Sequence, residues 1–177
     1  MHKFNKKKFE TAVHYALTLT KNHSEFYPLI RKAFEEAGVI FVILPNIVGS
    51  KINGATKKIG DNIMLMVNDR RLYSFWFTLF HEIGHIINGD YGISFEKESG
   101  EQEHAADLFA EDSLIPREQY NNFVARGRFG LKDIICFAES INRDPGIVLG
   151  RLQNDGLVGF DDWTMKPIRH KYRVKMA

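Results

Sequence analysis

One apolar stretch that also carries two histidines and a glutamate constrains the fold of this chain more than any other feature. Apolar side chains recur every three or four positions between Phe75 and Ile87, which predicts a largely buried helix. His81 and His85 stand four positions apart on it, and such positions lie on one face of a helix, one turn apart. Two ring nitrogens can therefore be aimed at the same point.

The residue types at this spacing indicate what that point holds. The segment 81–85 has the pattern H-E-x-x-H, and both rings can reach one ion at the roughly 2.0–2.1 Å that zinc requires. Glu82 lies about 100° around the helix from His81, where it can reach a water at the metal without being a ligand. Burying two imidazoles and a carboxylate among apolar residues is costly unless they share a task. We therefore predict a Zn²⁺ site, with Glu82 within reach of a water bound to the metal.

A catalytic zinc site needs a third protein ligand, and a downstream helix offers one. Glu103 follows His85 by 18 residues on a second predicted helix, which the polar loop at 90–100 lets fold back beside the first. Asp107 stands four positions further on the same face, and we expect it to accept the free N–H of a ligand histidine. The competing carboxylates fall nearer the charged outer side of this helix or outside its Ala/Phe-flanked segment: Glu101, Glu111 and Asp112.

The remaining periodicity predicts an α+β fold with a small antiparallel sheet and several helices. The β-branched run Val39–Leu44, closed by Pro45, predicts a buried strand, and residues 63–67 predict a second strand after a turn at 59–62. Further helices are predicted at 4–21, 24–37 (with Ser24 as N-cap and Gly38 as the stop), 101–113, 117–125, 131–141 and 145–154 (with Asp144 as N-cap, Pro145 first and Gly156 as the stop).

Cysteine content, hydropathy and charge indicate the cellular compartment of the protein and the partners that it binds. The single cysteine, Cys136, excludes an internal disulfide and a cysteine zinc site, fits a reducing cytoplasm, and is expected to be buried in its helix. No apolar run is long enough for a membrane span or a secretion signal, so a cytoplasmic protein is expected.

The segments 1–8 and 166–177 carry nine lysines and arginines and no acid, although the whole chain has a net charge of only +2. Basic charge at the ends alone does not predict direct nucleic-acid binding.

Domain organisation is simple at the level of the sequence. The 177 residues contain no internal repeat and no linker rich in proline, glycine or serine. We therefore expect a single domain over residues 1–160, followed by a basic C-terminal tail over 161–177.

Three segments together resemble one known family. They are FWFTLFHEIGH at 75–85, EHAADLFA at 103–110 and LIP at 114–116. Their combination resembles the ImmA/IrrE family of zinc metallopeptidase domains, and more narrowly the C-terminal domain of HigA-like helix-turn-helix antitoxin regulators. Leu44-Pro45, Gly54-Ala55, Phe137-Ala138 and the run GRLQ at 150–153 fit the same pattern, so the likeness covers most of residues 1 to 160.

This resemblance implies a zincin-like fold with a gluzincin-type site, in which His81, His85 and Glu103 bind zinc and Glu82 is the base. It implies a metallo-endopeptidase that cleaves a helix-turn-helix repressor or antitoxin protein, in a regulatory, toxin–antitoxin or mobile-element setting. Members of the family typically act on such a repressor or are fused to one. No DNA-binding module fits before the matching region, so we expect either a stand-alone peptidase encoded near its repressor or a piece of a longer regulator.

Two questions stay open at this level. The same ligands would serve a non-proteolytic zinc-containing module that binds a partner or acts as a sensor, although a base beside the metal favours the enzyme. A peptidase also needs a group that stabilises the oxyanion of the tetrahedral intermediate. The sequence offers four candidates for this group without deciding among them: Tyr91, His104, Tyr120 and Arg151. It predicts no oligomeric state.

Overall fold

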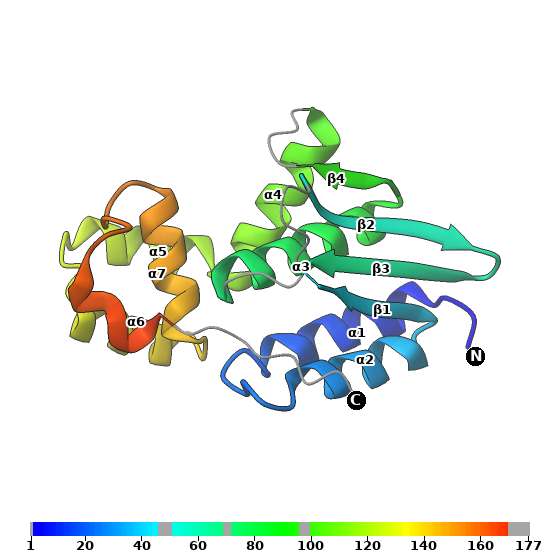
Figure 1. Ribbon diagram of the computed structural model, residues 1–177, viewed down its shortest axis with the longest axis horizontal. Helices are drawn as coiled ribbons and strands as arrows, with labels where there is room; N and C mark the ends of the chain where they lie inside the picture. The colour runs from blue at the N-terminus through cyan, green and yellow to red at the C-terminus, as the bar shows by residue number, and fades with distance from the viewer. Residues whose placement is uncertain (1, 46–50, 69–71, 96–99, 170–177) are drawn as a thin grey trace.

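The structure, a computed structural model, describes residues 2–45, 51–68, 72–95 and 100–169. A sheet flanked by helices lies at one end of the molecule and a group of short helices at the other (Figure 1). No helix in these ranges is both long and apolar enough to cross a membrane. The elements confirm the predicted α+β class; in chain order they are α1 (Lys6–Leu17), α2 (Phe26–Glu36), β1 (Val39–Leu44), β2 (Ile52–Ile59), β3 (Asn62–Asn68), α3 (Leu72–Asn88), β4 (Ile93–Phe95), α4 (Glu101–Leu114), α5 (Arg117–Ala125), α6 (Leu131–Ser140), α7 (Pro145–Asn154) and the 3₁₀ helix η1 (Trp163–Ile168).

The four strands form a mixed sheet in the order β1-β3-β2-β4. β1 pairs with β3 in parallel, whereas β2 is antiparallel to both β3 and β4. The prediction of a purely antiparallel sheet is therefore wrong. The β2–β3 hairpin places its second strand between β1 and β2, with β3 parallel to β1.

Helices cover one face of the sheet, and the core lies between them and the strands. α2 packs on β1, while α3 packs across β2 and β3. Phe34 of α2 and Phe41 of β1 illustrate the contact, because both are buried and their ring centroids are 5.6 Å apart. Along β1 and β3, buried residues alternate with half-buried or exposed ones. One face of the sheet is thus in the core, and the other is turned outward.

At the other end of the molecule, α7 packs on both α3 and α6. Its predicted boundaries are confirmed. Asp144 is the N-cap and accepts a hydrogen bond from the backbone N–H of Gly146 at 2.7 Å, with Pro145 in the first helical position. Gly156 follows the helix with a φ of +74°, a conformation that favours glycine at a helix end.

The residues after α7 are partly folded. η1 packs on α6 and α7, and its side chains Met165 and Ile168 are buried. η1 lies inside the segment 161–177 that is expected to be a basic tail, and its two buried apolar residues anchor the chain to the core. Residues 170–177 lie outside the described residues.

Two strands, β2 and β4, form in segments whose sequences do not predict a strand. β2 extends over INGATKKI, a segment with glycine and lysines that has little strand propensity of its own. β4 lies inside the segment expected to be a polar loop at 90–100, and it pairs with β2 through Ala55 and Ile93. Both segments become strands because each has a neighbour with which to share hydrogen bonds, a property that no local pattern records.

Two side chains are placed differently from their predictions. The N-cap of α2 is Glu25, not Ser24, because the Asn22 side chain accepts a hydrogen bond from the backbone N–H of Glu25 at 3.1 Å and forms the turn there. Cys136 is exposed, since it lies on the outward side of α6, whereas Ile134 and Ala138 are the residues of that helix buried in the core. The expectation of a buried thiol is wrong.

Asp144 is also a link between distant parts of the chain, and its removal should lower stability. Its backbone N–H donates to Thr20 Oγ1 at 3.1 Å, and its carboxylate contacts the ring of His23. Asp144→Ala removes the α7 cap, leaves the buried backbone N–H of Gly146 without this acceptor and removes the contact with His23. We expect the free energy of unfolding, measured by urea denaturation, to fall by about 1–3 kcal/mol.

The matched control is Asp133→Ala, which removes an exposed carboxylate that caps α6 by accepting a hydrogen bond from the backbone N–H of Gly130 at 3.1 Å. Loss of such an exposed cap alone should cost about 1 kcal/mol or less. An Asp144→Ala protein as stable as Asp133→Ala would contradict the role of Asp144 in joining α7 to the α1–α2 segment.

Candidate metal centre

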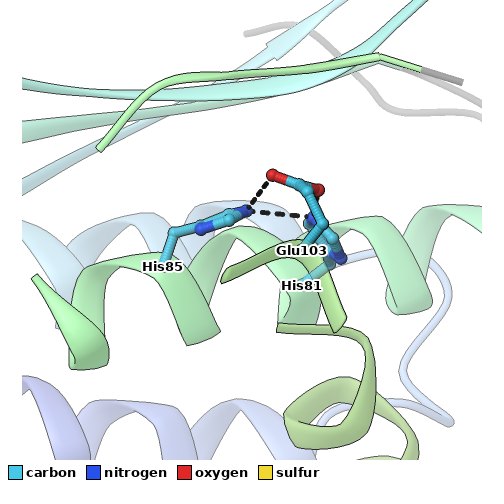
Figure 2. Close-up of side chains that lie close together, drawn as sticks. All are labelled: His81, His85 and Glu103. Carbon is cyan, nitrogen blue, oxygen red and sulfur yellow. Dashed lines mark hydrogen bonds and ion pairs between the residues drawn. The ribbon is translucent and has the colours of Figure 1, made fainter. Parts of the chain in front are cut away.

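Helix α3 holds the two predicted histidine ligands in the interior. Leu79, Phe80 and Ile83, which recur at helical spacing, are fully buried in the core. His81 and His85 are only 8% and 5% exposed, and their ring centroids are 4.8 Å apart. Figure 2 shows both rings pointing from α3 toward one place, on the side of the helix that faces the strands.

The third predicted ligand comes from α4, which lies alongside α3. Glu103 Oε2 is 2.9 Å from His81 Nε2, and Glu103 Oε1 is 3.1 Å from His85 Nε2. The two Nε2 atoms are themselves 3.1 Å apart. One potential ligand atom from each of the three residues lies within 4.8 Å of the others, so the group could hold a metal ion.

The close approach of α4 to α3 depends on Gly84, between the two histidines. A Cβ at this position would lie 3.2 Å from the Cα of Ala106 and 3.2 Å from the ring of Phe109, both on α4. A side chain there would press α4 outward. Gly84 therefore helps to bring Glu103 within reach of the histidines, a role that the sequence pattern did not reveal.

The second nitrogen of each histidine ring faces a carboxylate. His81 Nδ1 is 2.7 Å from Asp107 Oδ1, the contact expected from the spacing of Asp107 on α4. His85 Nδ1 makes the equivalent contact with Asp90, which follows α3. Carboxylates in these positions fix the orientation and the tautomer of a ligand histidine. The structure thus places one such acceptor behind each ring.

The sequence pattern does not identify Asp90 as a partner of His85, because the segment 88–90 predicts only the end of the helix. Gly89 has a φ of +75°, and the backbone N–H of Asp90 donates to the carbonyl of His85 at 3.0 Å. The N–H of Gly89 donates to the carbonyl of Ile86 at 3.2 Å, which completes a Schellman motif. This turn folds Asp90 back over the last turn of α3, beside the His85 ring. Gly89, directly after the helix that carries His85, is the sequence signal that could have indicated this turn and the position of Asp90.

The donor set of this cluster fits a zinc ion. An ionised carboxylate can only accept, so a neutral His81 or His85 would donate its Nδ1 proton to the carboxylate behind it and present the lone pair of Nε2 to the centre. Two such lone pairs and the carboxylate of Glu103 converge on one point, where they repel one another unless a cation lies among them. Two imidazole nitrogens and one carboxylate are a ligand set found in catalytic zinc sites.

Protonation of His81 responds to the same charges. Burial lowers the pKa of His81, but the hydrogen bond and charge of Asp107, together with the carboxylates of Glu82 and Glu103, outweigh it and raise the pKa above its ordinary value. Because a ligand histidine must be neutral, a metal ion has to displace this proton. The carboxylates that hold the proton would also attract the cation.

Glu82 lies beside this cluster against the sheet. Its side chain is fully buried, and it packs on the backbone of Gly54 in β2. A Cβ built on Gly54 would come within 2.8 Å of Glu82 Cγ and 2.8 Å of Glu82 Oε1. Only glycine at position 54 leaves room for the glutamate in this place. A glycine within a strand often marks such a close approach.

Replacing Gly54 by alanine should displace Glu82 and leave the metal ligands where they are. Because a misplaced catalytic group costs up to about 10²-fold in rate, we expect peptide cleavage in Gly54→Ala to fall by about 10-fold or more. Metal content, measured by mass spectrometry of the purified protein, should be unchanged. The control is Gly92→Ala, where a Cβ would meet nothing within 4 Å. Equal activity in the two variants would contradict a fitted contact between Gly54 and Glu82.

Loss of either carboxylate behind the rings should weaken metal binding. For Asp107→Ala and for Asp90→Ala we expect metal affinity to fall by about 10- to 100-fold, because the ring loses the group that fixes its orientation. Competition with a fluorescent zinc chelator measures this affinity. Asp112→Ala is the control, since Asp112 is exposed on α4 and pairs with Arg117 at 2.7 Å. Unchanged affinity in Asp107→Ala would show that its contact with His81 is incidental.

The competing carboxylates of α4 do not join the cluster. Glu101 is exposed, and Asp112 bonds to Arg117. Glu111, whose pKa is raised by burial, faces Arg151 of α7 at 3.6 Å. Among the described residues, the group that could hold a metal contains Glu103 as its carboxylate.

The four oxyanion candidates occupy different surroundings. The guanidinium of Arg151 lies 4.3 Å from the ring centroid of Tyr120, and both side chains bond to Asp155. These contacts hold the pair in a network that joins α5 to α7. His104 is exposed on α4, and Tyr91 is 39% exposed after α3. The hydrogen bonds to Asp155 and the ring contact thus direct Tyr120 and Arg151 toward each other.

Comparison with known proteins places this geometry in a family. Residues 40–135 match the family model of the IrrE N-terminal-like domain. This range contains β1 except for its first residue, β2 to β4, and α3 and α4 with all the side chains of the cluster. No curated protein matches the chain. The matched region is more than half of the chain, and the family is one of metallopeptidases. The chain therefore belongs to the metallopeptidase family of the IrrE N-terminal-like domain.

Proposed function

We propose that this chain is a zinc-dependent endopeptidase of the gluzincin type, with a zincin-like arrangement of α3 beneath the sheet. The observation that supports it most is the convergence of two Nε2 atoms and the Glu103 carboxylate, with Glu82 buried alongside. In this proposal His81, His85 and Glu103 hold the metal. Three protein ligands leave a fourth position for water or substrate.

The chemistry follows from this placement. A zinc ion held there would lower the pKa of a bound water toward about 7 and polarise the scissile carbonyl. Glu82 accepts a proton as water adds to the carbonyl carbon, and it returns that proton to the amide nitrogen as the C–N bond breaks. Its burial beside Gly54 keeps the carboxylate in one position and away from bulk solvent. A module that only binds a partner has no use for a base in this place.

We also propose the substrate class: a helix-turn-helix repressor or antitoxin protein in the cytoplasm, in a regulatory, toxin–antitoxin or mobile-element setting. Support comes from membership of the IrrE N-terminal-like family and from the resemblance of segments 75–85, 103–110 and 114–116 to ImmA/IrrE proteins. A single protein substrate also fits a regulatory peptidase better than digestion of polypeptides in general. Direct binding of this chain to nucleic acid is not part of the proposal.

The proposal is tested by metal analysis and a co-expression experiment. The purified chain should contain close to one zinc per molecule. Co-expression with the helix-turn-helix proteins encoded near its gene should yield a discrete fragment of one of them, identified by mass spectrometry. Cleavage by the purified enzyme should stop when a chelator removes the metal and resume when zinc is restored.

Each result has a defined meaning. A zinc-loaded protein that forms a complex with a helix-turn-helix protein without cleaving it would favour the non-proteolytic binding or sensor module. A purified chain that contains no zinc and does not take it up would overturn the metal centre itself. Cleavage that persists unchanged after complete metal removal would overturn the mechanism.

A further inference from the structure

The outward face of the sheet carries an apolar row that crosses all four strands. Residues in register on neighbouring strands point to the same face, and the pairings place Val42 beside Met66, Met66 beside Ala55, and Ala55 beside Ile93. This row alternates with the buried core residues of the same strands. Four apolar positions in line on a face turned away from the core are more than scattered surface residues.

Ala55 makes this row concave. It is the smallest residue of the row and lies at its floor, 8% exposed, whereas Ile93 on the far side is 53% exposed. Leu44 and Ile52, 39% and 38% exposed, extend the apolar walls. Together they line a groove of about 510 Å³, which we call the outer groove; Met66, Ala55, Ile93, Leu44, Ile52 and Tyr91 contribute to it.

Among the described residues that line the outer groove, the charged ones are basic. Lys57 and Lys58, both exposed on β2, lie at its rim, and Lys57 faces outward two residues from Ala55. None of the described residues that line the groove is acidic. Outside the basic segments 1–8 and 166–177 the chain carries more acidic than basic residues, so a basic rim here is a local feature. Complementary potentials across an interface favour an acidic partner.

We propose that the outer groove binds an amphipathic α-helix of another protein, one that presents apolar side chains flanked by aspartate or glutamate. A helix is the element that sheets bury on their faces, and the inner face of this same sheet already takes α2 and α3. An extended peptide would add to a sheet edge and would not lie across this row. Ala55 at the floor lets the helix approach closely, while Lys57, on the same face of β2 as Ala55, pairs with its acidic flank.

A second copy of this chain fits the outer groove less well. In a two-fold dimer the same patch lies on both subunits, so the lysine rims would be brought together across the interface. Like charges in that position oppose association. The row points to the face of the sheet opposite α3, although Gly54, which contacts Glu82 from the α3 side, also lines the outer groove. Helix binding should therefore not require the metal.

A pair of designed peptides tests the proposal. Both are fluorescein-labelled 18-residue helices with the same leucine stripe, one with glutamate and one with lysine at every flanking position. Fluorescence anisotropy with the full chain should show saturable binding of the glutamate peptide, and binding of the lysine peptide at least about 10-fold weaker. Ile93→Asp should weaken binding of the glutamate peptide by about 10-fold or more, because it places a charge in the apolar row. Added salt should weaken the preference for glutamate.

Charge exchange gives the sharpest comparison. The double variant Lys57→Glu/Lys58→Glu should reverse the preference and bind the lysine peptide more tightly. Matched controls lie elsewhere on the surface: Phe160→Asp changes an apolar residue that is 70% exposed, and Lys132→Glu changes an exposed lysine of α6. Both controls should bind as the wild type does, and circular dichroism should show that every variant is folded.

Several results would overturn the proposal. Equal affinity for the two peptides, or binding that Ile93→Asp leaves unchanged, would show that the outer groove does not select an acidic helix. Absence of binding to either peptide would have the same meaning. A dimer in analytical ultracentrifugation that Ile93→Asp dissociates would identify a second copy as the occupant.

Discussion

Replacing His85 by alanine is expected to leave the purified protein without its metal. Zinc binds protein sites of four ligands with free energies of about 10–16 kcal/mol, which is roughly 3 kcal/mol per ligand. The affinity of this chain for zinc should therefore fall by more than about 100-fold when the His85 ligand is lost. The wild-type chain should carry close to one zinc per molecule by mass spectrometry, and His85→Ala should carry almost none. Because zinc binds only the folded chain, adding zinc should raise the melting temperature of the wild type and not of the variant.

His104→Ala is the matched control for this result. His104 is exposed on α4, next to Glu103 in the sequence but outside the cluster. It should retain the metal and the zinc-dependent rise in melting temperature. Metal loss in His104→Ala with retention in His85→Ala would reverse the assignment of the ligands.

Replacing Glu82 by glutamine is expected to abolish most peptide cleavage while metal content stays the same. Glutamine keeps the shape of the side chain beside Gly54, but it cannot accept the proton of the attacking water. Since general acid–base catalysis contributes about 10²–10⁴-fold, cleavage of the helix-turn-helix substrate should slow by that factor. The rate is measured by quantifying the cleaved fragment over time.

Glu101→Gln provides the comparison, because Glu101 is an exposed glutamate in the first turn of α4. Its cleavage rate should equal that of the wild type. Metal loss in Glu82→Gln would make Glu82 a ligand, and cleavage at the wild-type rate in a metal-loaded Glu82→Gln protein would remove it from the mechanism.

The pattern on α3 shows how far sequence reasoning reaches. Helical periodicity predicts the helix, and helix geometry alone places His81 and His85 on one face, as the structure shows. The same logic places Asp107 on the face of Glu103, and the structure finds Asp107 at the His81 ring. Start and stop residues likewise predict the limits of α7. Each of these inferences uses neighbours within one or two turns.

The sheet shows where that reasoning ends. Val39–Leu44 is predicted as a strand because its own residues favour one, but nothing in it states which strand lies beside it or in which direction. β4 has three residues and is a strand only because β2 offers it hydrogen bonds. The parallel pairing of β1 with β3 likewise depends on where the hairpin docks.

The sequence by itself therefore determined which side chains are candidate ligands, their spacing on α3 and α4, and the family to which they point. Only the tertiary structure decided that Gly84 lets α4 approach α3, that Gly54 accommodates Glu82, and that a turn returns Asp90 to His85. The physical reason is that helix geometry repeats over a few residues and can be counted along the chain. Contacts between distant segments depend instead on which surfaces bury one another, and this is settled only when the whole chain packs.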